Sequence, residues 1–167
     1  MTKSVLLIRH AKAEDLGFTA KDIDRNLTSQ GIMQSAKLGK LLFEEGCVLD
    51  RAISSPANRA FQTAKVVFEQ LKRNEEEIKV DAGLYGSGPK GYLAALNAVG
   101  DDKSTVALFG HNPDISFFAE YLTRDDIMGS MKKATLIEIE FGADVQWAEI
   151  SGNMGTVRRR VDVASLT

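Results

Sequence analysis

Hydrophobic residues fall in short blocks along the first two thirds of the chain, and longer amphipathic stretches separate these blocks. The short blocks are typical of buried strands, which we expect at residues 4–9, 51–54, 78–80 and 105–109. Since strands and helical stretches alternate with short connections, the pattern predicts an α/β fold with a mostly parallel sheet flanked by helices.

Local signals show where the helices should begin. Thr28 suits the N-cap of a helix that ends near Gly46. The dipeptide Ser55-Pro56 predicts the start of a second helix, with serine as the cap and proline at the first helical position. Two more helices are expected, one from Tyr92 to Val99 and one that opens at Asn112-Pro113.

The last third of the chain contains two runs rich in β-forming residues, Thr135–Phe141 and Val145–Ile150. The few residues between them, which include Gly142 and Asp144, suit a hairpin. We therefore expect an antiparallel edge on the parallel sheet, in a three-layer α/β sandwich with helices on both faces.

Ionisable side chains follow two of the predicted strands. Arg9 and His10 end the first strand, and His111 follows the strand at residues 105–109; these two are the only histidines in the chain. Arg59 falls in the first turn of the helix after the second strand. Because right-handed crossovers bring parallel strand ends to one edge of the sheet, these side chains should share a crevice with two helix N-termini.

This combination of groups predicts an anion pocket suited to a tetrahedral dianion. Arginine offers a planar fork that matches phosphate oxygens, and helix N-termini offer free N–H groups. The alternative is that each histidine only satisfies backbone groups near a strand end and that each arginine pairs with a carboxylate. No acidic residue lies within four positions of Arg59, which leaves only a distant partner open.

Length and charge narrow the classes of function. The 167 residues suit one domain, 1–167, and a formal net charge of −2 gives no basic surface for nucleic acid. No apolar run approaches the roughly 20 residues that span a bilayer, so we expect no membrane partner. The single cysteine, Cys47, predicts a cytoplasmic protein. We interpret Arg158-Arg159-Arg160 as a solvated edge rather than a binding patch.

Other motifs fail on their context. Residues 86–91 match the G-x-G-x-x-G pattern of dinucleotide sites but do not join a first strand to a helix, so we expect a flexible loop beside the pocket. Asp22-Ile23-Asp24 follows no apolar strand and is expected in a polar loop. Two histidines at separate strand ends, without an H-E-x-x-H motif, predict no metal site.

Four segments, taken in order, resemble the histidine phosphatase superfamily and specifically its SixA-type phosphohistidine phosphatase branch. They are Leu7-Ile8-Arg9-His10-Ala11-Lys12-Ala13-Glu14, Arg25-Asn26-Leu27-Thr28-Ser29-Gln30-Gly31, Ser54-Ser55-Pro56-Ala57-Asn58-Arg59-Ala60-Phe61-Gln62-Thr63-Ala64 and Gly110-His111-Asn112-Pro113. Together they span most of the chain. The resemblance implies a phosphoglycerate mutase-like fold.

By this resemblance, His10 is the catalytic nucleophile that becomes phosphorylated. Arg9, Arg59 and His111 correspond to the rest of the phosphate pocket, with His111 also counted as catalytic. No cofactor is implied, and phosphate or sulfate is expected to bind in the pocket. The substrate is expected to be a phosphorylated protein that carries phosphohistidine, or a small phosphorylated molecule.

The chain departs from the superfamily pattern at one position. Many members carry a glutamate in an L-x-E setting that protonates the leaving group, whereas this chain has Leu84-Tyr85-Gly86. SixA-type members also lack that acid, and a phosphohistidine leaving group needs less help from one. Possible substitutes or rim residues are Glu14, Asp15, Asp114, Arg25 and Asn112.

The sequence therefore predicts a metal-independent phosphohistidine phosphatase. Two alternatives remain at this point. The first is a small-molecule phosphatase, or a mutase, with the same chemistry. The second is a non-catalytic binder of phosphate or phosphoprotein.

Overall fold

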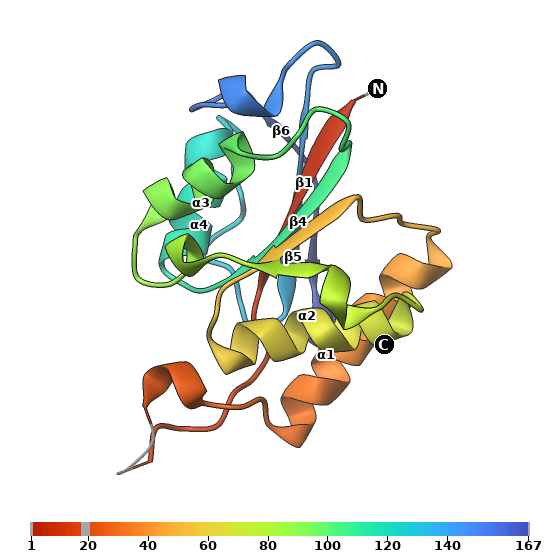
Figure 1. Cartoon of the computed structure of the whole chain (residues 1–167), viewed down its shortest axis with the longest axis vertical. Helices are drawn as coiled ribbons and strands as arrows, with labels where there is room; N and C mark the ends of the chain where they lie inside the picture. Colours follow the sequence, from red (N-terminus) through yellow and green to blue (C-terminus); the bar gives the residue numbers. More distant parts are fainter. Residues whose placement is uncertain (1, 18–20, 167) are drawn as a thin grey trace.

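The computed structural model describes residues 2–17 and 21–166, which fold around one six-stranded sheet with the strand order β3-β2-β4-β1-β5-β6 (Figure 1). The four strands β1, β4, β2 and β3 pair in parallel, and β5 and β6 add an antiparallel edge. The strands are β1 (Lys3–Arg9), β2 (Arg51–Ser54), β3 (Ile78–Val80), β4 (Thr105–Gly110), β5 (Thr135–Phe141) and β6 (Thr156–Asp162).

Four α-helices cover the two faces of this sheet. They are α1 (Ser29–Glu44), α2 (Asn58–Gln70), α3 (Pro89–Asn97) and α4 (Asp114–Leu122). Helices α1 and α2 pack on one face, and α3 and α4 on the other (Figure 1). The three-layer sandwich with an antiparallel edge is therefore confirmed. No helix among the described residues is long and apolar enough to cross a membrane.

Strand β1 shows how the sequence builds both layers at once. Val5 and Leu7 belong to the core beneath α3 and α4, whereas Leu6 and Ile8 belong to the core beneath α1 and α2. All four side chains are at most 1% exposed. Because successive side chains of a strand point to opposite faces, an unbroken apolar run is what a strand between two helical layers requires.

The pairing of β1 with β4 sets the position of the two histidines. In this parallel register Arg9 lies opposite Gly110, so His10 and His111 each follow the last paired residue of neighbouring strands. The N–H of His10 donates to the carbonyl of Gly110 at 3.0 Å and continues the pairing by one residue. Both histidines thus leave the sheet at its carboxyl edge.

The predicted strand at Val145–Ile150 is wrong, and so is the hairpin before it. A short 3-10 helix, η4 (Trp147–Glu149), occupies this segment, and the sixth strand comes later. The apolar residues Trp147 and Ile150 are buried against the core, while the indole N–H donates to the carbonyl of Lys103 at 2.7 Å. Their hydrophobicity therefore reflects burial beneath the sheet rather than strand pairing.

The sixth strand contains the arginine cluster, which was expected to be a solvated edge. Only Arg158 fits that description, with a side chain 60% exposed. Arg159 pairs with Glu45 and with the buried Glu138. The side chain of Arg160 is 6% exposed and donates to carbonyls of residues 127–130. The cluster is thus mainly a structural feature of the sheet edge.

The two predicted helix caps have different outcomes. The hydroxyl of Thr28 accepts from the N–H of Gly31 at 3.0 Å and caps α1 as predicted. Helix α2 instead begins at Asn58, with Ala57 as its N-cap and no side-chain cap. The prediction that Ser55 caps this helix is therefore wrong, and its hydroxyl contacts His111 instead.

Gly110 provides a test of the close packing at the carboxyl edge. A Cβ on this residue would lie 2.0 Å from the hydroxyl oxygen of the fully buried Tyr92. Since neither group has free space, Gly110→Ala should lower the free energy of unfolding by about 1–3 kcal/mol, as overpacked sites generally do. Urea unfolding followed by circular dichroism measures this change.

The matched control is Gly142→Ala, because the nearest atom to its new Cβ is the side chain of Val145 at an ordinary 3.6 Å. This variant should unfold like the parent protein. Equal stability of the two alanine variants would contradict the packing argument.

Candidate active site

The carboxyl edge of the sheet brings together the four side chains that the sequence singled out. His10 and His111 have ring centroids 5.2 Å apart and are 6% and 8% exposed. Arg9 is the last residue of β1, and Arg59, also buried, is the second residue of α2. Their shared location means that two positive charges and two imidazoles face one small region.

The ring of His10 is fixed by a single hydrogen bond. Its Nδ1 lies 2.7 Å from the carbonyl oxygen of Ala11. Since a carbonyl can only accept, Nδ1 carries the hydrogen, and Nε2 of the neutral ring keeps its lone pair. No partner of Nε2 occurs among the described residues. The local backbone therefore selects the tautomer in which the outer nitrogen is a nucleophile.

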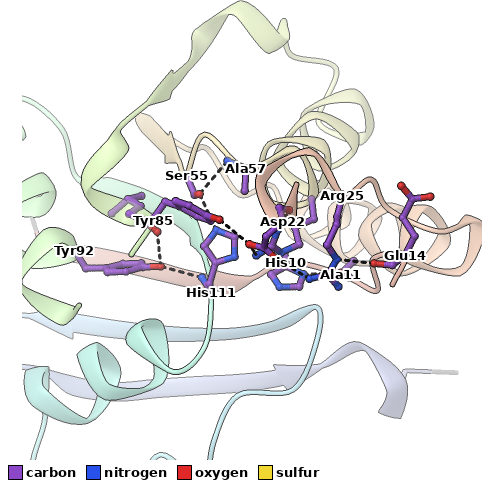
Figure 2. A network of polar contacts seen from close by, with 12 residues as sticks. His10, Ala11, Glu14, Asp22, Arg25, Ser55, Ala57, Tyr85, Tyr92 and His111 are labelled. Carbon is purple, nitrogen blue, oxygen red and sulfur yellow. Dashed lines mark hydrogen bonds and ion pairs between the residues drawn. The ribbon is translucent and has the colours of Figure 1, made fainter. Parts of the chain in front are cut away.

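His111 is held from two sides (Figure 2). Its backbone N–H donates to the hydroxyl of the buried Tyr92 at 2.9 Å, and its Nε2 lies 2.7 Å from the hydroxyl of Ser55. That hydroxyl accepts from the N–H of Ala57, so its own hydrogen can be donated to Nε2. In this arrangement Nδ1 of His111 carries a hydrogen, and this buried nitrogen has no partner in the part of the chain that the structure describes.

Arg9 is arranged in a similar way. One terminal nitrogen donates to the carbonyl of Met131 at 2.9 Å, while the buried Nε has no partner among the described residues. Burial also lowers the pKa of the guanidinium below its ordinary value. Arginine nevertheless stays charged at any working pH because its ordinary pKa is so high.

Arg59 has a distant carboxylate partner, the one possibility that the local sequence left open. Its Nη1 donates to the backbone carbonyl of Asp22 at 2.8 Å, and its Nη2 donates to a carboxylate oxygen of the same residue at 3.0 Å. The third nitrogen, Nε, is buried and has no partner within residues 2–17 and 21–166. Asp22 belongs to a 3-10 helix, η1 (Asp22–Asp24), where the sequence predicted only a polar loop.

Asp22 connects three segments of the chain. Besides Arg59, its carboxylate accepts from the phenol of Tyr85 at 2.7 Å and from Arg25 at 3.0 Å (Figure 2). The hydrogen bond from Tyr85 and those from Arg25 and Arg59 hold the pKa of this carboxyl far below its usual range. The same contact raises the pKa of the Tyr85 phenol. Asp22 is therefore a permanent negative charge at the edge of the site.

Both histidines are neutral in this environment. Burial lowers the pKa of His10 to about 3, the hydrogen bond with the Ala11 carbonyl opposes this shift, and the charges of Arg59 and Arg9 act in the same direction as burial. Burial and then Arg59 lower the pKa of His111 to about 4, against a smaller opposing effect of Asp22. Neutral imidazole is the form in which His10 has a free lone pair.

An open cavity of about 400 Å³ lies beside Arg59 and His111. Its lining residues come from the 3-10 helix η1, the start of α2, the loop after β3 and the turn after β4, namely Asp22, Arg59, Tyr85, Gly86, Gly88, His111, Asn112, Pro113 and Asp114. Two of the glycines expected in a loop beside the pocket are among them. The cavity is large enough for a phosphoryl group together with part of its leaving group.

The five additional candidates take different positions. Asp114 lines the cavity and accepts from the N–H of Gly88 at 3.1 Å, and Asn112 also lines it. Arg25 reaches the site through Asp22. Glu14 is exposed and accepts from the backbone of Asn26, with its carboxylate turned away from the histidines in Figure 2.

Asp15 is exposed, and none of the contacts described above involves it. Of the three acidic candidates, only Asp114 therefore lies in the cavity wall.

Sequence reasoning missed four residues of the site: Asp22, Ser55, Tyr85 and Tyr92. Ser55 and Tyr85 stood within the quoted segments, but each was given another meaning, as a helix cap and as part of a missing acid motif. Asp22 was assigned to a polar loop and Tyr92 to a helix, because their partners in the site lie 37 and 19 positions away in sequence. No group of three or more metal-ligating side chains occurs in the described part of the chain.

Comparisons with known proteins find similar sequences and a similar fold. Residues 5–85 match the histidine phosphatase superfamily (branch 1), a region that includes His10 and Arg59. The uncharacterized protein Rv1276c of Mycobacterium tuberculosis is 33% identical over 113 residues, which cover 67% of each chain. A phosphoglycerate mutase of Afipia carboxidovorans that depends on 2,3-bisphosphoglycerate is 32% identical over 98 residues, or 56% of this chain.

The chain spans less than half of the first curated relatives that it matches, with 45% of that mutase covered. Among solved structures, the protein histidine phosphatase SixA complexed with tungstate superposes with a TM-score of 0.83. That match covers 98% of this chain and 99% of the other, at 21% identity, so it concerns the fold. Together with the match of Rv1276c over two thirds of both chains, these findings show that the chain belongs to the histidine phosphatase superfamily.

Proposed function

We propose that this protein is a phosphohistidine phosphatase in which His10 forms a covalent phosphoenzyme. One observation carries the proposal. Each of the four central side chains forms a hydrogen bond through at least one nitrogen and has another nitrogen without a partner among the described residues. These unpartnered nitrogens are Nε of Arg9, Nε2 of His10, Nε of Arg59 and Nδ1 of His111. One lone pair and three N–H donors in one place match a phosphoryl group, which needs a nucleophile and partners for three oxygens.

The first step is a transfer to His10. The lone pair of Nε2 attacks phosphorus, the new N–P bond forms, and the bond to the leaving group breaks with its electrons. The carbonyl of Ala11 stabilises the positive charge that develops on the ring through the Nδ1 hydrogen. In the second step water attacks phosphorus, the N–P bond returns its electrons to Nε2, and phosphate leaves.

The charge of the phosphoryl oxygens is met by the chain itself. The free Nε–H groups of Arg9 and Arg59 and the Nδ1–H of His111 can each donate to an oxygen. Once a dianion is bound, it favours the protonated form of His111 and so raises the low pKa of the empty site. For this reason we propose that turnover needs no metal ion.

The leaving group should be one that departs without a strong acid. The position where many superfamily members carry a glutamate is Gly86, which lines the cavity without a side chain. The imidazole of phosphohistidine can be protonated before the N–P bond breaks, so it tolerates this gap. The structure of the protein histidine phosphatase SixA holds tungstate, an oxyanion like phosphate. Its similarity in fold supports the proposal that this chain is a phosphohistidine phosphatase.

A mutase is the second candidate, favoured by the similarity to the phosphoglycerate mutase of Afipia carboxidovorans. A mutase that uses a bisphosphate cofactor needs positive charge for a second phosphate. Among the residues that line this cavity, Arg59 is the one cation, and Asp22 and Asp114 add negative charge. Hydrolysis therefore fits the cavity better than transfer between two phosphorylated positions does.

The single cysteine cannot form an internal disulfide, which suits a reducing compartment. We therefore propose that the protein acts on phosphoproteins of the cytoplasm.

The titration of the two histidines tests whether the nucleophile is neutral. Both imidazoles should titrate near pH 3–4 in the folded protein, against about 6.5 after unfolding in urea. NMR of the ring nitrogens measures this directly, because the chain has only two histidines.

The direction of the pKa shifts of His10 and His111 also determines how the free energy of unfolding changes with pH. Below pH 6.5 the unfolded chain binds protons that the folded chain does not. The free energy of unfolding should therefore fall from about pH 6.5 toward pH 4 because of these two groups. A folded-state pKa near 6.5 for His10 would contradict the proposed ground state.

Trapping of the intermediate tests the identity of the nucleophile. When turnover of labelled phosphohistidine peptide in excess EDTA is quenched, the protein should carry phosphate that is stable in base and lost in acid. Peptide mapping should place it on His10, and His10→Ala should abolish both the label and turnover. A label on another residue, or activity that magnesium restores after EDTA, would refute the mechanism.

The dependence on the leaving group tests the missing acid. Phosphohistidine and aryl phosphates should be cleaved at least about 100-fold faster, by kcat/KM, than phosphoserine or sugar phosphates, because one general acid is generally worth that much. The amide variants Glu14→Gln, Asp15→Asn and Asp114→Asn should change phosphohistidine turnover little. Equal rates for alkyl esters and phosphohistidine would favour the small-molecule phosphatase instead.

A further inference from the structure

We infer that Asp22 is a positioning residue for the phosphate site, because it holds both terminal nitrogens of Arg59 and so leaves Nε as the nitrogen that meets the phosphoryl group. The inference rests on the proposed function, and it assigns to that reaction a carboxylate outside the four central side chains. Asp22 alone accepts from both terminal nitrogens of the Arg59 guanidinium in the described structure.

The two contacts come from different parts of Asp22. Its backbone carbonyl receives Nη1 of Arg59 at 2.8 Å, and its carboxylate receives Nη2 at 3.0 Å. A planar guanidinium that is bound at both ends can no longer rotate about its long axis. The direction of the Nε–H bond is then fixed by Asp22 rather than by the phosphoryl group that arrives.

The Nε of Arg59, whose direction Asp22 fixes, is buried and needs an acceptor. The side chain of Arg59 is 8% exposed, and its Nε has no partner among the described residues. A buried N–H without a partner costs free energy, and it persists in native proteins where a ligand supplies the missing acceptor.

Asp22 itself is held in place from outside the pocket. Tyr85 donates to the carboxylate oxygen that also receives Arg59, and Arg25 donates to the other one. The turn is closed by the N–H of Arg25, which donates to the carbonyl of Asp22 at 3.2 Å. The carbonyl of Asp24 in the same turn accepts from Asn58, the residue next to Arg59. Asp22 and Arg59 are therefore linked by side chains and by backbone.

The alternative role for Asp22 is to oppose anion binding. A carboxylate on a phosphate-binding arginine could act as an internal competitor that the phosphoryl group must displace. The two roles predict effects of opposite sign on anion affinity. Removal of a competitor, or simply of a nearby negative charge, strengthens binding of an anion, whereas removal of a positioning contact weakens it.

The decisive measurement is binding of orthovanadate by calorimetry, together with kcat and KM for phosphohistidine peptide. Asp22→Ala should weaken vanadate binding and lower kcat/KM by about 10-fold or more, the usual scale for a hydrogen bond to a charged group. Asp22→Asn keeps an acceptor oxygen and should retain more of both. The control is Asp24→Ala, since the carboxylate of Asp24 makes none of these contacts, and it should behave like the parent.

A double-mutant cycle with Arg59→Ala shows whether Asp22 acts through Arg59. In that background Asp22→Ala should cost less than 2-fold, because the side chain it positions is gone. Tighter vanadate binding by Asp22→Ala, or an undiminished loss in the Arg59→Ala background, would overturn the inference. Urea unfolding of each variant separates a folding defect from a change in the site.

The test distinguishes this inference from the proposed function. If the parent protein binds vanadate but hydrolyses no phosphorylated substrate, the phosphatase assignment fails, and the effect of Asp22→Ala on vanadate affinity still decides the role of Asp22. If turnover proceeds through His10 and Asp22→Ala matches the parent in both measurements, the function stands and the positioning role is refuted.

Discussion

The parallel pairing of β1 with β4 is the constraint on which the rest of this structure depends. It places Arg9 opposite Gly110 and sends His10 and His111 out of the sheet side by side. A slip by one residue would turn every side chain of β1 to the opposite face. Val5 and Leu7 would then exchange layers with Leu6 and Ile8, so the core that fixes the register also fixes the separation of the two imidazoles.

The second principle of the site is that its donors are held before anything binds. Arg9 is held by Met131, Arg59 by Asp22 and His111 by Ser55, and in each case one buried nitrogen has no partner among the residues described. Such groups lower the stability of the empty protein. The free energy is recovered when an anion supplies the acceptors, so binding and folding stability are linked at this point.

Much of the fold could be read from the sequence because its signals are local. Strands β1 and β4 contain unbroken apolar runs of ordinary strand length, and Thr28 caps α1 through a contact three residues away. The sixth strand escaped detection because it is rich in charge: Arg158 and Arg159 pair with glutamates on β5 and with Glu45, the residue that follows α1. Conversely, the buried Trp147 made a short 3-10 helix resemble a strand.

The residues of the site also fall into two groups, those that local sequence patterns predict and those that they do not. The four central residues stand at strand ends or at a helix start, positions that sequence patterns mark. Of the residues that hold them, Ser55 also follows a strand, but Asp22 does not. Asp22 lies in a short turn, and it reaches Arg59 across 37 residues and Tyr85 across 63. Contacts of this kind depend on how the loops return to the sheet edge, which a single sequence does not reveal.

The two outer strands decide how this sheet can meet other molecules. On one side β3 offers only three residues to a further strand, and on the other β6 carries the half-exposed charge of Arg158 beside Glu138 and Glu140. Short or charged edges resist the addition of a strand from another chain. An extended segment of a phosphorylated protein would therefore gain little by lengthening the sheet, and its recognition falls to the side chains and loops around the carboxyl edge.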